Sequence, residues 1–553
     1  MISWREVRDH PLLGRPSALG LVLGSILFAL SLTPSLIPRS GPMQGLLGGI
    51  CFAIGYLIGA SLVMLWDWML ERPARSERFV RQSLWVALGL GVVVAGWGLW
   101  NVTRWQNGIH SAMQIPPVES ARPFTILCVA AGVAVGLIGI GRIFRRLWRM
   151  ISAQLEGLLP RRLALVVGLG LAFLLFWSVG NDLVLRRVLG AMDETYAAVD
   201  KLIPPDRAAP SDPLKTGSAA SLASWEGLGA EGRNWISSAP DGDEITAATG
   251  LAAVQPLRVY VGLNNAKTPE ERAALALAEA KRVGAFDRRT LVIATPTGTG
   301  WMDPAGMQVL DYLTGGDVAT IAVQYSYLPS WMSLFLQPEY GSETSEALFH
   351  AIYGHWRSLP IETRPRLFLF GLSLGSRNGE FAATSPMTLG DPVDGAFWVG
   401  PPFAATGWRQ VVSGREAGST AWAPRFGDGS ILRSMTQKID PVGEGAAWGA
   451  VRVVYLAYPS DPIAHFTTDT LWRRPDWLSG PRGPDVSPGL GWYPVVTFLQ
   501  LALDMMTATS PPPGRGHVYA ARDYLRGWEE VLGLKTPPET LARIDQALAD
   551  QGL

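Results

Sequence analysis

The chain has 553 residues with 47 basic and 47 acidic side chains, so its formal net charge at pH 7 is zero. This balance argues against the strongly basic surface that nucleic acid requires, and no nucleic-acid partner is predicted. Its two cysteines, Cys51 and Cys128, fall within apolar segments near the N-terminus. The region after residue 185 therefore has no disulfide and no cysteine metal site, and neither a metal nor a cofactor is predicted.

Five long apolar runs occupy the first third of the chain. Each has about 17–25 residues, enough to cross a hydrocarbon core of about 30 Å at 1.5 Å per helical residue. Glycines recur in all five, and in lipid such small residues let helices pack closely. Buried helices of a soluble protein are the alternative, which the scarcity of charges disfavours. We predict a transmembrane helical domain over residues 1–185, with spans at 17–38, 46–70, 84–100, 124–144 and 163–183.

Arginines near these runs predict their orientation. They are frequent before the first run, between the second and third, and between the fourth and fifth, but sparse in the alternate loops. The positive-inside rule then puts the N-terminus in the cytoplasm, and an odd number of spans puts everything after residue 185 outside. Arginine greatly outnumbers lysine, which favours a bacterial origin. We predict a multi-pass protein of the bacterial inner membrane with an extracytoplasmic C-terminal half.

Residues 186–253 form a predicted connector, with an amphipathic helix at 187–202 that could lie on the membrane surface. From residue 254 to 553, short apolar strands alternate with helical segments, which predicts one domain with a mostly parallel sheet and helices on both faces. Regular periodicity fades between residues 400 and 449, and we interpret that stretch as an insertion or cap. The predicted strands are 257–262, 290–294, 318–325, 366–370, 396–399 and 451–457, and the predicted helices are 269–283, 304–313, 343–357, 376–384 and 520–532.

The fourth of these strands runs directly into a Gly-x-Ser-x-Gly sequence centred on Ser373. A strand, this motif and a helix in that order are typical of a nucleophile elbow, in which the serine occupies a strained turn. The flanking positions, Gly371 and Gly375, must be small because the turn brings backbone segments close together. Ser373 is therefore the predicted nucleophile.

A serine hydroxyl needs a base, usually a histidine held by a carboxylate. After an elbow serine the partners follow in the order acid, then histidine. His517, in a loop rich in proline and glycine before the last predicted helix, is the candidate base, and a surface histidine is the alternative. Asp461, just past the strand at 451–457, is the candidate acid, although an Asp-Pro turn could also explain it. Asp391, Asp394 and Asp485 are possible substitute acids.

An oxyanion hole requires backbone N–H groups at the point where negative charge develops. The residue after the nucleophile, Leu374, should supply one, and the loop Thr297, Gly298 and Thr299 after an early strand should supply another. The same loop could cradle a phosphate, but no P-loop lysine follows it. Aromatic and neighbouring side chains could line an apolar acyl pocket, although such residues are more often core; they are Trp301, Tyr325, Tyr327, Trp331, Phe403 and His465.

Several sequence blocks together resemble the bacterial membrane-anchored α/β-hydrolases of the Abhydrolase_9 type, which join an N-terminal multi-span domain to a serine hydrolase domain. The resemblance covers nearly the whole chain and implies an α/β-hydrolase fold with Ser373, Asp461 and His517 as its triad. It does not supply a substrate. The blocks are 31–39 (SLTPSLIPR), 217–229 (GSAASLASWEGLG), 295–301 (TPTGTGW), 324–331 (QYSYLPSW), 373–376 (SLGS), 460–463 (SDPI), 485–488 (DVSP) and 514–519 (GRGHVY).

These observations favour an extracytoplasmic serine hydrolase of esterase or lipase type. Five spans exceed what an anchor needs, so the expected partners are the lipid bilayer and a lipidic or acyl-ester substrate. An acyltransferase of envelope lipids or glycans would use the same triad and is the first alternative. A non-enzymatic membrane scaffold or transport protein is the second, and the serine, acid and histidine in fold order argue against it.

Overall fold

The computed structural model describes residues 16–70, 76–181, 186–203, 207–330, 332–333, 339–383, 386–440 and 446–553. They divide into two compact units. The first, here called the helical unit, contains the chain up to Met192 together with Thr468–Leu478 and Asp485–Asp504. The second, the sheet unit, contains Asp193–Thr467, Ser479–Pro484 and Met505–Leu553.

Among the described residues, four helices of the helical unit are long and apolar enough to cross a membrane, one fewer than the sequence predicted. They are α3 (Gly41–Met69), α4 (Glu77–Ala112), α5 (Pro123–Leu155) and α6 (Arg161–Ser178), the last continuing to Asn181 as a candidate span. After α6 the chain forms α7 (Arg186–Lys201), which matches the predicted amphipathic helix at 187–202 to within one residue. The boundary between the two units falls inside α7.

The first predicted span is wrong in its length. Helix α2 (Ala18–Ser31) has 14 residues and rises only about 21 Å, less than the roughly 30 Å of a hydrocarbon core. Pro34 disfavours helical geometry at Thr33, so the helix cannot easily continue. At its last residue, the hydroxyl of Ser31 donates to the carbonyl oxygen of Phe28 at 2.7 Å, which satisfies one of the carbonyl groups near the helix end. The chain then continues as a buried non-helical loop to Arg39.

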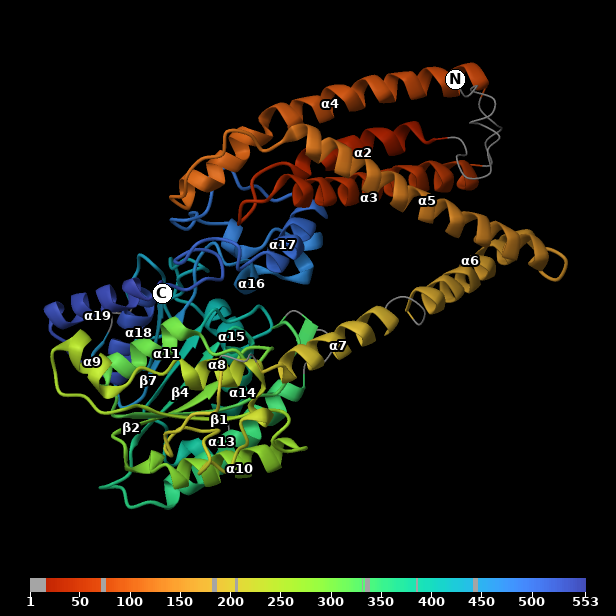
Figure 1. Ribbon diagram of the computed structural model, residues 1–553. Helices are drawn as coiled ribbons and strands as arrows, with labels where there is room; N and C mark the ends of the chain where they lie inside the picture. Colours follow the sequence, from red (N-terminus) through yellow and green to blue (C-terminus); the bar gives the residue numbers. More distant parts are fainter. Residues whose placement is uncertain are drawn as a thin grey trace. The chain divides into compact units, whose positions relative to one another are not determined.

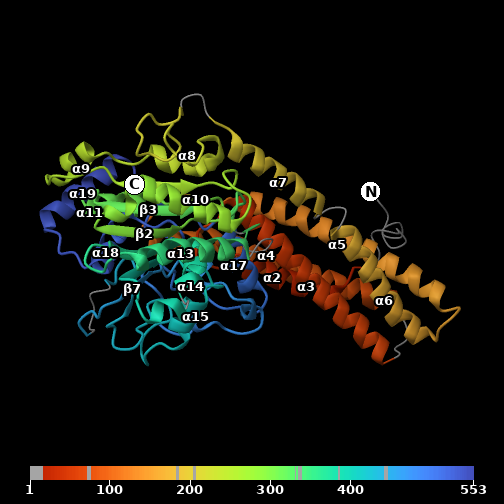
Figure 2. The same cartoon turned by 90° about the horizontal axis from the view of Figure 1, so that it is seen from below.

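Glycine allows α2 and α3 to approach closely, as predicted for these runs. A Cβ atom at Gly59 would lie 2.7 Å from Cα of Gly20, so a larger residue there would force the helices apart. A Cβ at Gly49 would meet the Val133 side chain of α5 at 2.6 Å. Helices α2, α3 and α4 run side by side in both views of the chain (Figure 1 and Figure 2).

The helical unit also includes a part of the chain from far beyond the predicted spans. Its helix α17 (Val496–Met506) is apolar, and Val496 and Leu503 are buried against Leu47 and Cys51 of α3. We call the two stretches Thr468–Leu478 and Asp485–Asp504 the return segments. They leave the sheet unit after Asp461 and rejoin it before His517 in the sequence.

In the part of the sheet unit that the structure describes, seven strands form one sheet in the order β1-β3-β2-β4-β5-β7-β6, all parallel. This confirms the predicted α/β-hydrolase-type architecture. The sequence predicted six of the strands and missed the edge strand β6 inside residues 400–449, where only four residues pair. The strands are β1 (Leu257–Val261), β2 (Thr290–Thr295), β3 (Val318–Val323), β4 (Arg366–Leu372), β5 (Gly395–Val399), β6 (Leu432–Met435) and β7 (Arg452–Leu456).

Helices cover both faces of this sheet (Figure 1 and Figure 2). One layer contains α10 (Pro269–Arg282), α13 (Tyr340–Ser358), α14 (Leu374–Ala383) and α15 (Thr406–Ser413). The other contains α8 (Gly229–Ser237), α9 (Gly242–Thr249), α11 (Pro304–Leu313), α18 (Ala521–Leu532) and α19 (Pro538–Asp550).

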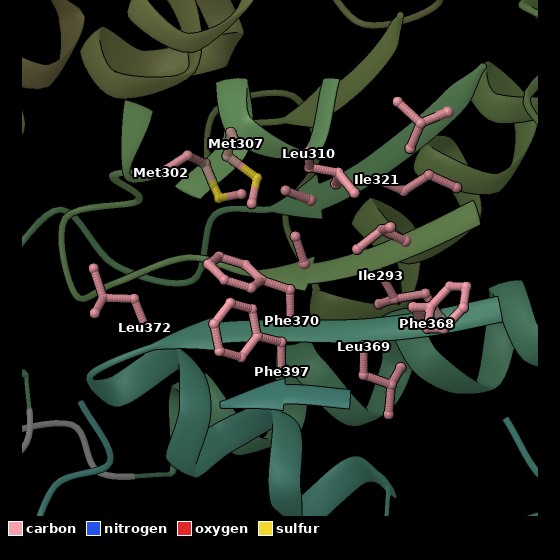
Figure 3. Close-up of a cluster of buried hydrophobic side chains, with 14 of the residues drawn as sticks. Ile293, Met302, Met307, Leu310, Ile321, Phe368, Leu369, Phe370, Leu372 and Phe397 are labelled. Atoms are coloured by element: carbon pink, nitrogen blue, oxygen red, sulfur yellow. The ribbon is translucent and has the colours of Figure 1, made fainter. Parts of the chain in front are cut away.

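The core of the sheet unit is centred on β4, whose buried run of apolar residues is typical of a parallel strand covered on both faces. Phe370 stacks on Trp528 of α18 at 5.4 Å between ring centroids. Phe370 and Phe397 of the neighbouring strand lie side by side (Figure 3). Trp235 and Ile245, from the predicted connector, join the same core. The part of the connector that carries them therefore packs on the sheet.

Candidate active site

Ser373 lies on the turn between β4 and α14, as the motif predicts. Its φ of 56° is in the left-handed region, which costs energy for any residue with a side chain. The Ser373 amide donates to the carbonyl oxygen of Val399 at 2.9 Å, which ties the turn to the end of β5. The flanking glycines are required, because a Cβ at Gly371 would lie 2.4 Å from the backbone of Gly375 and one at Gly375 would lie 2.1 Å from the Thr295 carbonyl oxygen.

Asp461 and His517 form a hydrogen-bonded pair at the end of β7. Nδ1 of His517 lies 2.7 Å from Oδ2 of Asp461, and the Asp461 side chain has no exposed surface. The same Oδ2 accepts a hydrogen bond of 2.7 Å from the hydroxyl of Tyr519, while Oδ1 accepts one of 2.9 Å from the Ile463 amide. Three donors therefore surround this buried carboxyl group and fix its orientation.

The ring of His517 lies against the backbone that also holds the serine. Gly400 directly follows Val399, the residue bonded to the Ser373 amide, and has a φ of 52°. A Cβ at Gly400 would lie 2.6 Å from Cε1 of His517. Because β4, β5 and β7 are neighbours and parallel, their carboxyl ends meet at one edge of the sheet. Ser373, which follows β4, and the Asp461–His517 pair, which follows β7, therefore lie at the same edge of the sheet.

Buried tyrosines and carboxyl groups that no sequence motif indicates lie beside this pair. The hydroxyl of Tyr524 donates to Asp303 at 2.6 Å, and the hydroxyl of Tyr458 donates to Asp523. The rings of Tyr458 and Tyr519 stack at 4.4 Å. One signal was available, since Tyr519 follows His517 by two residues, and this spacing puts side chains on the same side of an extended chain.

Burial shifts the protonation of two groups near the pair. It raises the pKa of Asp303 to about 6, against the opposing effects of the Tyr524 hydroxyl, backbone amides and His517. It lowers the pKa of His465 to about 4, with Asp461 opposing the shift. His465 is the last residue of the short helix α16 (Pro462–His465). Because its pKa is lowered to about 4, its imidazole is neutral at pH 7.

The substitute acids occupy other positions. Asp391 accepts two hydrogen bonds from Arg364, at 2.5 and 2.7 Å, and Asp394 accepts one of 2.8 Å from the Leu367 amide at the start of β4. Both lie toward the amino end of the strand that carries Ser373 at its carboxyl end. Asp485 begins the second return segment of the helical unit.

The loop predicted to complete the oxyanion hole packs on the elbow through the Thr295–Gly375 contact. Within it, the Thr297 amide donates to the Trp301 carbonyl oxygen at 3.1 Å, and the Gly298 amide donates to Oγ of Ser330 at 3.2 Å. Leu374 is the first residue of α14, so its amide has no acceptor within the helix. An amide at a helix N-terminus is well placed to stabilise an anion.

The predicted pocket residues have different surroundings. The ring of Phe403 packs on Phe466 at 5.0 Å, and its amide donates to the Ile463 carbonyl oxygen, so it lies next to the segment that carries Asp461. Tyr325 is buried just after β3, whereas the hydroxyl of Tyr327 contacts Asp193 of α7 at 3.2 Å. Trp301 is partly buried against the core of the sheet unit. Trp331 lies outside the described residues.

Among the residues that the structure describes, no group of three or more histidine, cysteine, aspartate or glutamate side chains is arranged to hold a metal ion.

Comparison with protein families gave two matches that together cover most of the chain. The model Abhydrolase_9, described as an alpha/beta-hydrolase family, matches residues 257–544. The model Abhydrolase_9_N, described as the N-terminus of an alpha/beta-hydrolase family, matches residues 32–240. Comparisons with curated proteins and with solved structures gave no significant match.

Proposed function

Because this chain belongs to the alpha/beta-hydrolase family, we propose that it is a membrane-anchored serine hydrolase that cleaves an ester or related acyl bond. The observation that carries the proposal is the buried Asp461–His517 hydrogen bond beside the strained elbow of Ser373. This combination of a serine on a strand-to-helix turn and a histidine held by a carboxylate is the arrangement that activates a hydroxyl nucleophile.

In the proposed reaction, Oγ of Ser373 attacks the substrate carbonyl carbon while Nε2 of His517 accepts the hydroxyl proton. The tetrahedral intermediate collapses, the carbon–oxygen bond to the leaving alcohol breaks, and His517 returns the proton to that alcohol. A water molecule then attacks the acyl-serine with His517 again accepting a proton. The carboxylic acid leaves, and the proton returns to Ser373.

The hydrogen bonds around Asp461 support the role given to His517. With the Nδ1–H of the imidazole directed to the carboxylate, Nε2 is left as the acceptor that a general base needs. The Tyr519 hydroxyl and the Ile463 amide hold the carboxylate in this orientation. We assign Leu374 N–H as one oxyanion donor. Because the Thr297 and Gly298 amides have acceptors within the protein, we assign the second donor to Thr299.

The expected substrate is lipidic, and the helical unit is expected to span the bacterial inner membrane. An odd number of spans from a cytoplasmic N-terminus would place the sheet unit outside the cytoplasm, but with four candidate spans instead of five this argument no longer holds. The arginine pattern still supports an extracytoplasmic sheet unit. The α3–α4 and α5–α6 connections are rich in arginine and are therefore expected on the cytoplasmic side, which puts the end of α6 on the other side of the membrane. We therefore propose that the sheet unit is extracytoplasmic.

A fluorophosphonate probe tests the nucleophile directly. We expect labelling of the full chain, and no labelling of the Ser373→Ala variant. The matched control is Ser376→Ala, three residues further along in the first turn of α14, whose side chain is fully buried. Equal labelling of the wild-type chain and Ser373→Ala, or loss of labelling in the control alone, would remove Ser373 from this role.

A further inference from the structure

The helical unit contains a large cavity that the proposed hydrolase chemistry does not use. Its volume is about 1830 Å³, and its walls come from α2, α3, α4 and α5, with Phe176 of α6. Ligand sites for small molecules usually measure about 300–1,000 Å³. This cavity therefore has room for a ligand larger than most metabolites. The helices that enclose it are labelled in Figure 1.

Most of the side chains that line the cavity are apolar, and many of them are exposed on the surface of the helical unit. Leu57 of α3, Val86 and Leu90 of α4, and Ile140 of α5 line it, and each of these side chains is about half exposed or more. These helices are among the candidate membrane spans. An apolar wall of this kind, reached from the side of a membrane helix, is suited to hydrocarbon chains.

Positive charge is concentrated on one wall of the same cavity. Arg142, Arg145, Arg146 and Arg149 all line it from α5. Their spacing of three, four and seven residues puts them on one face of that helix. Among the described residues that line the cavity, Asp67 is the only one with a carboxylate, so the four guanidinium groups give this wall an excess of positive charge. Guanidinium groups bind phosphate through paired hydrogen bonds, which a single amine cannot do.

We propose that this cavity binds an acidic phospholipid, with its phosphate at the arginines of α5 and its acyl chains along the apolar walls of α3 and α4. The arginine-rich connections predict that this end of α5 faces the cytoplasmic leaflet, where acidic lipids are concentrated. The cavity belongs to the helical unit, and the proposal does not depend on the proposed hydrolase activity.

The test measures retention of lipids that differ only in their head groups. The purified full chain in detergent is mixed with phosphatidylglycerol or with phosphatidylcholine of identical acyl chains, and bound lipid is counted by native mass spectrometry. We expect the wild-type chain to retain phosphatidylglycerol preferentially. Each arginine near a lipid surface contributes about fivefold to such binding, so Arg145→Gln with Arg149→Gln should weaken retention by at least tenfold.

The matched control replaces Arg78 and Arg81 with glutamine. These arginines lie in the first turns of α4, are exposed, and do not line the cavity. We expect this control, and Ser373→Ala, to retain lipid as the wild-type chain does. Equal retention of the two lipids by the wild-type chain, or an equal loss in the Arg78/Arg81 control, would overturn the proposal.

A photo-reactive amino acid at position 57 identifies the occupant even if the arginine variants fold poorly. Illumination of the protein in native membranes should give a cross-link to phospholipid at this position. A cross-link to residues 1–15 of the same chain would instead show that the N-terminal segment fills the cavity, and a covalent dimer would show that a second copy does. Either of these cross-links, in the absence of a cross-link to phospholipid, would contradict the proposal.

Discussion

Arg39 and Asp504 form a buried ion pair although 465 residues separate them in the sequence. Nη2 of Arg39 lies 2.7 Å from Oδ1 of Asp504, and both side chains are almost completely buried. Asp504 also accepts hydrogen bonds from the Ser35 hydroxyl and the Leu36 amide. Buried non-helical backbone is tolerated where protein groups satisfy its polar atoms. The pair and its neighbours do this for the loop that follows α2.

Loss of one partner should leave the other charge buried and unpaired. We expect Arg39→Met to lower the free energy of unfolding by about 3–5 kcal/mol. Because the return segments lie between Asp461 and His517 in the chain, kcat should fall as well. The control is Arg161→Met, whose ion pair with Glu156 is exposed and 3.8 Å long, and which should cost less than about 1 kcal/mol. Unfolding midpoints in detergent measure both, and equal effects would contradict the structural role of Arg39.

The hydrogen bonds to Asp461 predict a graded effect on turnover. Asp461→Asn should lower kcat by about 10⁴, because the amide favours the wrong tautomer of His517. Tyr519→Phe removes one neutral donor and should lower kcat by roughly 2–10-fold with little change in KM. Hydrolysis of an activated ester measures both variants. A Tyr519→Phe variant as impaired as Asp461→Asn would show that Tyr519 does more than position the carboxylate.

Gly400 should be as important to activity as a site residue although it has no side chain. In Gly400→Ala the new Cβ would lie 2.6 Å from Cε1 of His517 and would also strain a backbone with φ of 52°. We expect His517 to be displaced and kcat to fall by at least about a hundredfold, since small misplacements of catalytic groups have effects of this size. Gly390→Ala, which has open space around it, is the control. Full activity of Gly400→Ala would contradict the position of the His517 ring.

Glu380 on α14 should make stability depend on pH. Its carboxyl group is buried, accepts a hydrogen bond of 2.9 Å from the Gly407 amide, and has a pKa raised to about 7 by burial. Since the folded pKa exceeds the unfolded value, this group stabilises the fold most below about pH 4.5. Its contribution of about 3 kcal/mol is lost as the pH rises through 7.

The Glu380→Gln variant tests this dependence. It should lack the change with pH and become more stable relative to the wild-type chain between pH 4.5 and 8. Unfolding midpoints of both proteins across that range measure the difference. A constant difference across the range would show that folding does not raise the pKa of Glu380.

The proposed orientation predicts opposite accessibility for two connections of the helical unit. In a chain with both native cysteines replaced by alanine, Glu119→Cys lies between α4 and α5, and Glu156→Cys follows α5. An impermeant maleimide applied to intact spheroplasts should label position 119 and leave position 156 unlabelled until the cells are lysed. The reverse pattern would put the sheet unit in the cytoplasm.

Much of the sheet unit could be predicted from local sequence patterns. Buried parallel strands are continuous apolar runs, so the sequence predicts the strand before Ser373 and its neighbours. Strand β6 has only four paired residues and a mixed composition, so its sequence gives no such signal. Composition predicts one span over residues 17–38, because an apolar run does not by itself show where a helix ends. In the structure α2 ends at Ser31, shortly before Pro34.

The sequence by itself determined the strand–turn–helix around Ser373 and the apolar helices, because these depend on residues close together in the chain. Only the tertiary structure decided that α17 packs with the helical unit, that Arg39 pairs with Asp504, and that Tyr519 holds the carboxyl group of Asp461. Such contacts join residues that are far apart in the chain, and no repeating pattern in the sequence indicates which of them will meet. Their energies depend on burial and on distances that exist only after the chain has folded.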